Sequence, residues 1–373
     1  MQIEGSPFVI AGPAQPDELI GRHDVLATLS DRAARGRFVL LVAPRRYGKT
    51  TLVHRLRHDA HATKDLDVVI VDLMGVQTLG DIALRLAQAW TRLPQGPLAK
   101  AAAVVLPYVR GLDVSGGVAT LHLRPRPAPT EGATLEGVLD IPRAVAERTG
   151  RRVLVVLDEF QAIASVDRAD AIIRSQIQHH TDQVSYLFAG SERSTLHMLF
   201  NEASRPLYGQ AEQVALDPFD PAALGDYLAD HLSASGRDIT ADGLAAYLAF
   251  TEGHPQRSML VADCLWAVAG PGTTVDRPQV DAAVDLALER CDAEFAAVHA
   301  LVSEAQARVL RLLAWVQPLT GAAAQRLGLS QGSARAAGAS LAERGLLRGK
   351  AQPSYRITDP LLAEWMRRMT PAP

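Results

Sequence analysis

The stretch FVLLVAPRRYGKTTLVHRL, Phe38 to Leu56, places a short loop between two patterns of different period. The six residues at 38–43 are continuously apolar, as in a strand that is buried on both faces of a sheet. From Lys49 onward the apolar residues recur at helical spacing. The order of strand, tight loop and helix predicts an α/β fold, in which loop N–H groups and a helix N-terminus point toward one spot.

The loop itself predicts a phosphate-binding site. Its letters, APRRYGKT, match the P-loop pattern except that Ala43 stands where the first glycine usually stands. Gly48 would let the backbone approach phosphate, Lys49 would lie between the β- and γ-phosphates, and Thr50 would offer its hydroxyl to Mg²⁺. The alternative is a chance Gly-Lys-Thr at a helix start. The candidate nucleotide contacts are Ala43, Pro44, Arg45, Arg46, Tyr47, Gly48, Lys49, Thr50 and Thr51.

A second strand-like run ends in two acids. The sequence VLVVLDEFQ carries apolar β-formers into Asp158 and Glu159. Because the carboxyl ends of parallel strands meet at one edge of a sheet, both acids are expected beside the phosphate loop. We predict that Asp158 holds Mg²⁺ through its water and that Glu159 polarises the attacking water, with Lys49 as a further catalytic residue. The alternative is a surface acid pair that caps the next turn. Glu159 favours hydrolysis over storage of the nucleotide.

Composition limits the class of protein. The chain has 373 residues, of which 48% are hydrophobic and 21% are charged, enough for two or three domains with their own cores. The start of the chain has no signal-like pattern and no run of about 18 apolar residues occurs, so we expect a cytoplasmic protein without a membrane partner. The two cysteines, Cys264 and Cys291, are far from any histidine cluster and are expected to be packing residues.

The pattern along the chain predicts three domains. Residues 1–216 alternate strand-like and helix-like runs, which indicates a parallel sheet covered by helices, with a Pro/Gly-rich insertion at about 92–130. Within that insertion, VATLHLRP alternates as in a small hairpin and has no assigned function. Residues 217–300 are expected to contain helices only, as a helical lid. Residues 301–373 have the spacing of a winged helix-turn-helix.

Charge is concentrated at the C-terminal end. The formal charge of −3 argues against general nucleic-acid binding, but residues 301–373 hold ten Lys and Arg against four Asp and Glu, which leaves the rest near −9. On the expected third helix of this domain, only Gln331 and Arg335 would reach base edges well. The side chains expected to hold phosphates are Arg348, Lys350, Arg356, Arg367 and Arg368.

With these motifs placed, the chain resembles the archaeal-type ATPases of the STAND/AAA+ group of P-loop proteins, from Glu18 to about Arg368. The ordered set that carries the resemblance is ELIGRHDVLATL, the Pro-Arg-Arg phosphate loop, LDEFQ, YLFAGSERS, RPLYGQAEQVALDPF, TEGHPQ and YRITDPLLAEWMRR. The resemblance implies a Mg²⁺-dependent ATPase domain with ATP or ADP as its nucleotide, followed by a helical lid and a winged helix. It also implies that YLFAGSERS forms the strand between the two strands already described.

Several site residues follow only from this resemblance. Ile20, Gly21 and Arg22 would lie along the adenine, and Ser191 would take the polar sensor position near the γ-phosphate. In TEGHPQ, Gly253, His254 and Pro255 would face the nucleotide, and Arg257 would be a second sensor. His254 could instead have a structural role at a helix N-terminus.

The chain also departs from the family pattern. Some relatives have Arg after PLYG, where this sequence has Gln210, so an arginine finger is not available there. Arg193 and Arg205 could substitute, although a surface or salt-bridged role is favoured for each.

Two functions therefore stay open from the sequence. One is an ATP-hydrolysing molecular switch that couples its nucleotide state to the C-terminal winged helix, with a second copy of the chain or a protein client as partner. The other is a nucleotide-gated DNA-binding or regulatory protein with slow turnover. In the second case, the winged helix contacts DNA through its basic wing and tail.

Overall fold

The structure is a computed structural model that describes residues 5–12, 15, 18–63, 66–93, 96–105, 112–115, 118–121, 130–180, 183–349 and 353–373. The chain divides into two compact units. The sheet unit comprises Gln15–Pro44 and Lys49–Leu216. The helical unit comprises Met1–Ala14, Arg45–Gly48 and Asp217–Pro373. The division into three domains stays a prediction.

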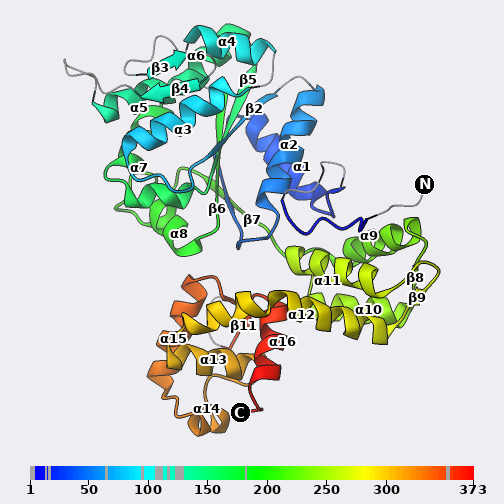
Figure 1. Cartoon of the computed structure of the whole chain (residues 1–373). Coiled ribbons are helices and arrows are strands. Elements are labelled where there is room, and N and C mark those ends of the chain that lie inside the picture. Colours follow the sequence, from blue (N-terminus) through cyan, green and yellow to red (C-terminus); the bar gives the residue numbers. More distant parts are fainter. Residues whose placement is uncertain are drawn as a thin grey trace. The chain divides into compact units, whose positions relative to one another are not determined.

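A parallel sheet forms the centre of the sheet unit (Figure 1). The strand order is β2-β5-β6-β1-β7, and every neighbouring pair is parallel. The predicted α/β class with a parallel sheet is therefore confirmed, and β6 lies between β1 and β5 as the resemblance implied. The strands are β1 (Val39–Val42), β2 (Leu66–Asp72), β5 (Arg152–Asp158), β6 (Val184–Gly190) and β7 (Glu212–Ala215).

Helices cover both faces of this sheet, which explains why its central strands are mostly apolar and why even Ser185 of β6 is buried. On one face lie α1 (His23–Ala34) and α2 (Lys49–Thr63) (Figure 1). On β5, alternate side chains such as Val153 and Val155 enter the core on the other face. The helices that contribute to that core are α3 (Leu79–Thr91), α4 (Pro97–Val105), α5 (Glu131–Leu139), α6 (Ile141–Thr149), α7 (Ala169–Ile177), α8 (Arg193–Asn201) and the 3₁₀ helix η3 (Phe160–Ser165).

The insertion contains α4 (Pro97–Val105) and a two-stranded antiparallel sheet of β3 (Leu112–Ser115) and β4 (Val118–Leu121). A hairpin is present, but residues 118–121 of the predicted stretch form only its second strand, and the first strand, β3, precedes that stretch. Residues 122–125 lie outside the described part of the chain.

The helical unit continues from the sheet unit with α9 (Pro221–Ala234), α10 (Ala241–Thr251), α11 (Pro255–Val268) and α12 (Arg277–Ala300). The expectation of helices only in 217–300 was wrong. The short strands β8 (Asp238–Ile239) and β9 (Thr274–Val275) pair in parallel. Two residues are too few to show the alternation from which a strand is predicted.

The last part of the helical unit has the order α13, α14, α15, β10, β11, α16, and β10 pairs with β11 in antiparallel fashion. Cys264 and Cys291 are buried free thiols, as predicted. In the described part of the chain, every helix is too short or too polar to cross a membrane. These elements are α13 (Glu304–Ala314), α14 (Ala322–Arg326), α15 (Gln331–Glu343), β10 (Leu347–Arg348), β11 (Arg356–Ile357) and α16 (Pro360–Met369).

Candidate nucleotide site

Lys49 begins α2 directly after the phosphate loop, and its side chain is folded back over that loop. Its Nζ donates to the carbonyl oxygens of Ala43 at 3.2 Å and Pro44 at 3.3 Å, and the side chain is only 6% exposed. Arg46 and Gly48 have positive φ, whereas Ala43 does not, so alanine fits the place of the first glycine without strain. Thr50 is exposed in the first turn of α2. The lysine is therefore held over the loop, and its contact with phosphate stays a prediction.

Asp158 ends β5 and Glu159 follows it, at the carboxyl edge of the sheet, as predicted. Asp158 Oδ1 accepts the backbone N–H of Glu159 at 2.9 Å. Burial raises the pKa of the Asp158 carboxyl, and the positive charge of Lys49 acts in the opposite direction, which places the two side chains within electrostatic range. Glu159 has φ 51°, a left-handed conformation that is strained for a non-glycine residue and that clusters at functional sites.

The carboxylate of Glu159 is held by donors from two other positions. Ser191 Oγ, just after β6, donates to Glu159 Oε2 at 3.0 Å. Gln161 Nε2 donates to the same oxygen and lies 3.5 Å from Ser191 Oγ. The structure thus brings together Glu159 and Ser191, two of the predicted catalytic residues. Gln161 was not predicted as a site residue, although it closes the quoted motif LDEFQ.

The donor set fits Mg²⁺. A threonine hydroxyl and a carboxylate are hard oxygen ligands of the kind that this ion prefers, and it usually retains several waters. In the described residues, no group of three or more His, Cys, Asp and Glu side chains has the geometry of a metal site. A Mg²⁺ site built from Thr50, Asp158, water and phosphate oxygens would not require such a cluster of side chains.

The residues expected along the adenine lie at the start of α1. Ile20 is buried, Gly21 has φ 58°, and Arg22 is the N-cap of α1 with φ 64°. Their contact with adenine stays a prediction.

In the helical unit, His254 is the N-cap of α11. Its Nδ1 accepts the backbone N–H of Arg257 at 3.3 Å, and its ring stands edge-on to Tyr47 with centroids 5.0 Å apart. Burial lowers the pKa of His254 to about 4, so the ring is neutral at pH 7, as an acceptor at Nδ1 requires. The structure therefore gives His254 the helix N-terminal role, and its contact with nucleotide stays a prediction.

The neighbours of His254 fix the turn into α11. Gly253 has φ 68°, and a Cβ there would lie 2.5 Å from the carbonyl oxygen of Phe219, so only glycine fits. Pro255 occupies the first turn of the helix, where its missing N–H costs no hydrogen bond. Both residues therefore have a structural reason to be there.

Arg257 is almost completely buried, with 1% of its surface exposed. Its guanidinium forms ion pairs with Asp359 at 2.6 Å and Glu294 at 2.9 Å, and it donates to Cys291 Sγ at 3.4 Å. Glu294 Oε1 also accepts from Arg46 at 2.5 Å. The predicted second sensor is therefore already paired with two carboxylates, and a contact with phosphate would require these pairs to open.

Arg193 and Arg205, the two candidates for an arginine finger, have different surroundings. Arg205 forms an ion pair with Asp170 at 3.4 Å, so the salt-bridged interpretation holds for it. Arg193 is exposed at the start of α8, and Gln210 donates to the carbonyl of Tyr208.

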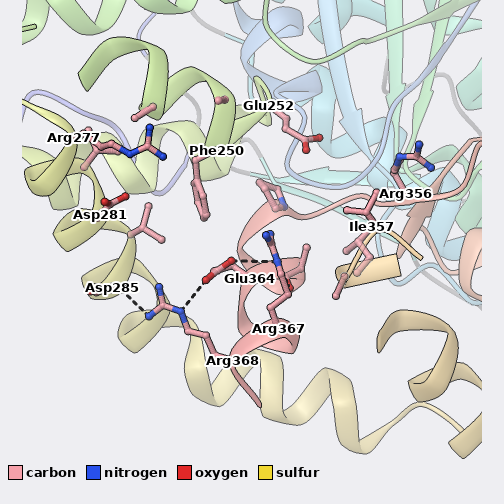
Figure 2. A pocket seen from close by; sticks show the side chains of 18 of the residues that line it. Phe250, Glu252, Arg277, Asp281, Asp285, Arg356, Ile357, Glu364, Arg367 and Arg368 are labelled. Atoms are coloured by element: carbon pink, nitrogen blue, oxygen red, sulfur yellow. Dashed lines mark hydrogen bonds and ion pairs between the residues drawn. The ribbon is translucent and has the colours of Figure 1, made fainter. Parts of the chain in front are cut away.

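A separate groove of about 930 Å³ lies within the helical unit between α10, α12 and α16 (Figure 2). Arg368 lies there between Asp285 at 2.7 Å and Glu364 at 2.9 Å. Apolar side chains such as Phe250 and Ile357 complete its lining. None of the predicted nucleotide contacts lines this groove.

Residues 32–199 match the family model of the AAA domain. The chain is similar in structure to a Walker-type ATPase of Pyrococcus abyssi, with a TM-score of 0.71 and 17% identity over 96% of this chain and 99% of that chain. It is also similar to the ORC2 protein of Aeropyrum pernix, solved as ADPNP–ADP complexes, with a TM-score of 0.60 and 17% identity over 98% and 97% of the two chains. Comparison with curated protein sequences gives no match. At these identities, the structural similarity shows the fold alone.

Proposed function

We propose that this chain is a Mg²⁺-dependent ATPase of the AAA+/STAND type that acts as a molecular switch. The observation that carries the proposal is the carboxylate of Glu159, held by Ser191 just after the neighbouring strand β6 and placed one residue after Asp158. A protein that bound nucleotide without hydrolysing it would not need a carboxylate held in a strained conformation at this edge of the sheet. The AAA-domain match supports the same class.

In the proposed reaction, the oxygen of a water molecule forms a bond to the γ-phosphorus, and the bond from that phosphorus to the β–γ bridging oxygen breaks. Glu159 orients the water and accepts its proton. Lys49 moves from the loop carbonyls to the β- and γ-phosphates and stabilises the charge on their oxygens. Thr50 and Asp158 would hold Mg²⁺, which would neutralise further charge on the phosphates.

Residues 301–373 are proposed to form a winged helix. Support comes from the order of α13, α14 and α15, followed by the antiparallel pair β10–β11 and by α16. We further propose that residues 217–300 form a lid and that the nucleotide state controls what the winged helix binds. A second copy of the chain and a protein client are the proposed kinds of partner besides DNA.

DNA binding is the second candidate function. The outer face of α15 supports it, because Gln331, Gly332, Ser333 and Arg335 are exposed there. Only the side chains of Gln331 and Arg335 are long enough to read bases well, so contact would be mainly with phosphate.

The decisive experiment separates binding from turnover of radiolabelled ATP. Lys49→Ala should abolish binding while the circular dichroism spectrum is retained. Glu159→Gln should bind ATP with unchanged affinity and hydrolyse it at least about 10²-fold more slowly, because the proton acceptor is lost. Glu202→Gln, an exposed glutamate after α8, is the matched control and should behave as wild type. Equal turnover by wild type and Glu159→Gln would overturn the proposed hydrolytic site.

A further inference from the structure

Gln161 is a buried amide with an incomplete set of hydrogen bonds. Only 8% of its surface is exposed in η3, two residues after Glu159. Its Nε2 faces Glu159 Oε2 and Ser191 Oγ. Its Oε1 has no hydrogen-bond partner among the described residues. Burying an amide oxygen without a partner costs free energy, so an apolar side chain of the same length would make a more stable core.

The surroundings of the Gln161 amide favour one of the two orientations in which its oxygen and nitrogen are exchanged. If the amide were turned over, its oxygen would face the negatively charged oxygen of Glu159, which repels it. Gly190 provides the space for Oε1, since a Cβ at that position would overlap with it. The glycine at the end of β6 and the ionised carboxylate therefore together fix how Gln161 points.

This arrangement distinguishes the two oxygens of Glu159. Both donors, the Gln161 amide and the Ser191 hydroxyl, bind Oε2. In the described part of the chain, Oε1 accepts no hydrogen bond from another residue. The carboxylate is therefore held at one oxygen, and the other is left to meet water.

We infer that Gln161 is a positioning residue for hydrolysis: its amide N–H fixes the carboxylate of Glu159 through Oε2 so that Oε1 orients the attacking water. The inference rests on the proposed ATPase function. Since the described partners of Gln161 are Glu159 and Ser191 and include no residue of the phosphate loop, it acts on turnover and leaves ATP affinity unchanged.

Two substitutions test the role of the N–H donor. Gln161→Met keeps the length of the side chain and removes the donor, whereas Gln161→Glu keeps its shape and replaces the donor with a negative charge. We expect kcat to fall by roughly 10-fold or more in Gln161→Met and further in Gln161→Glu, with KM and ATP affinity unchanged. Gln178→Met, at an exposed glutamine that ends α7, is the matched control and should keep wild-type kinetics. A packing role predicts the opposite order, because the glutamate fits the space of glutamine better.

A double-mutant cycle then tests whether Gln161 acts through Glu159. In a Glu159→Gln background, measured in single-turnover assays, Gln161→Met should change the residual rate by less than about two-fold. A loss as large as in the wild-type background would overturn the inference, as would a wild-type kcat in Gln161→Met. Wild-type turnover that does not depend on Glu159 is a separate outcome, which overturns the proposed function and this inference with it.

Discussion

The guanidinium of Arg257 lies 2.6 Å from Oδ2 of Asp359, so α11 is tied to the N-terminus of α16 by a buried ion pair. The other oxygen of Asp359 caps α16 by accepting the N–H groups of Leu361 and Leu362. One carboxylate therefore completes a helix and neutralises an arginine that has almost no access to water.

Removing that arginine should be costly. Arg257→Met leaves Asp359 and Glu294 without their common partner, and breaking a buried pair from one side typically costs about 3–5 kcal/mol of unfolding free energy. The measurement is chemical denaturation followed by circular dichroism. Arg290→Met is the control, because Arg290 pairs with Asp263 at a more exposed position, where the loss should stay near about 1 kcal/mol or below. Equal losses in the two variants would show that burial of Arg257 adds nothing.

Replacing Asp158 should have the opposite effect to replacing Arg257. The ionised Asp158 carboxylate should lower the free energy of unfolding at neutral pH. Because burial raises the pKa of its carboxyl in the folded state, folding favours the protonated form. The stability of the wild type therefore falls as pH rises through the carboxyl range, and Asp158→Asn does not share this loss. We expect the variant to unfold at a higher temperature at pH 7, with a difference that shrinks toward low pH.

The same variant should lose its response to metal. Mg²⁺ added with ATP should raise the unfolding temperature of the wild type but not that of Asp158→Asn, because the proposed ligand is removed. Asp167→Asn, an exposed aspartate of the sheet unit, is the control and should keep the wild-type response. A Mg²⁺-dependent shift that survives in Asp158→Asn would exclude Asp158 as a ligand.

The sequence predicts the fold best where a structural element follows from a local pattern of apolar and polar residues. Apolar runs that end at Ala43 and Leu157 mark two strands whose carboxyl ends share an edge, so the places of the phosphate loop and of Asp158 in the fold could be predicted before any contact was known. Gln161 could not, because its role depends on Ser191, 30 residues away in the chain. The partners of Arg257 are still more distant, with Asp359 at a separation of 102 residues. Pairwise contacts between distant positions leave no periodic pattern in a single sequence.

His254 predicts a pH dependence of stability. Burial lowers its pKa in the folded state from the ordinary histidine value of 6.5 to about 4, so folding favours the neutral ring. Stability should fall as pH decreases from 6.5 toward 4, by up to about 3 kcal/mol, because the unfolded chain binds the proton first. His254→Asn keeps an N-cap acceptor and removes this titration.

Denaturation of both proteins at several pH values checks this expectation. Burial also lowers the pKa of His180 to about 4. This histidine is present in both proteins, so its contribution cancels in the difference between them. The wild type should lose stability relative to His254→Asn across this window. A difference that does not change between pH 7 and pH 4 would show that His254 is accessible to protons in the folded state.

The last prediction separates DNA binding from partner docking. The proposed wing contains Arg348, which is paired with Glu252, and Arg356, whose guanidinium donates to the carbonyls of Pro353 and Tyr355. Lys350, the third basic residue of the predicted wing, lies outside the described residues. Surface pairs of this kind are weak, so phosphate would replace Glu252 at low salt. Binding should therefore be insensitive to sequence and fall steeply with salt.

Changing Arg348, Lys350 and Arg356 together to Ala should weaken binding to all DNA sequences alike and reduce the slope of log affinity against log salt by roughly one unit per lost contact. Changing Arg308, Arg311 and Arg326 to Ala removes the same formal charge from α13 and α14 and is the matched control. If both triple variants weaken binding equally, the effect comes from net charge and the wing is not a specific contact. If the wild type binds no DNA at low salt with either ATP or ADP, residues 301–373 are better explained as a module that docks a protein partner or a second copy of the chain.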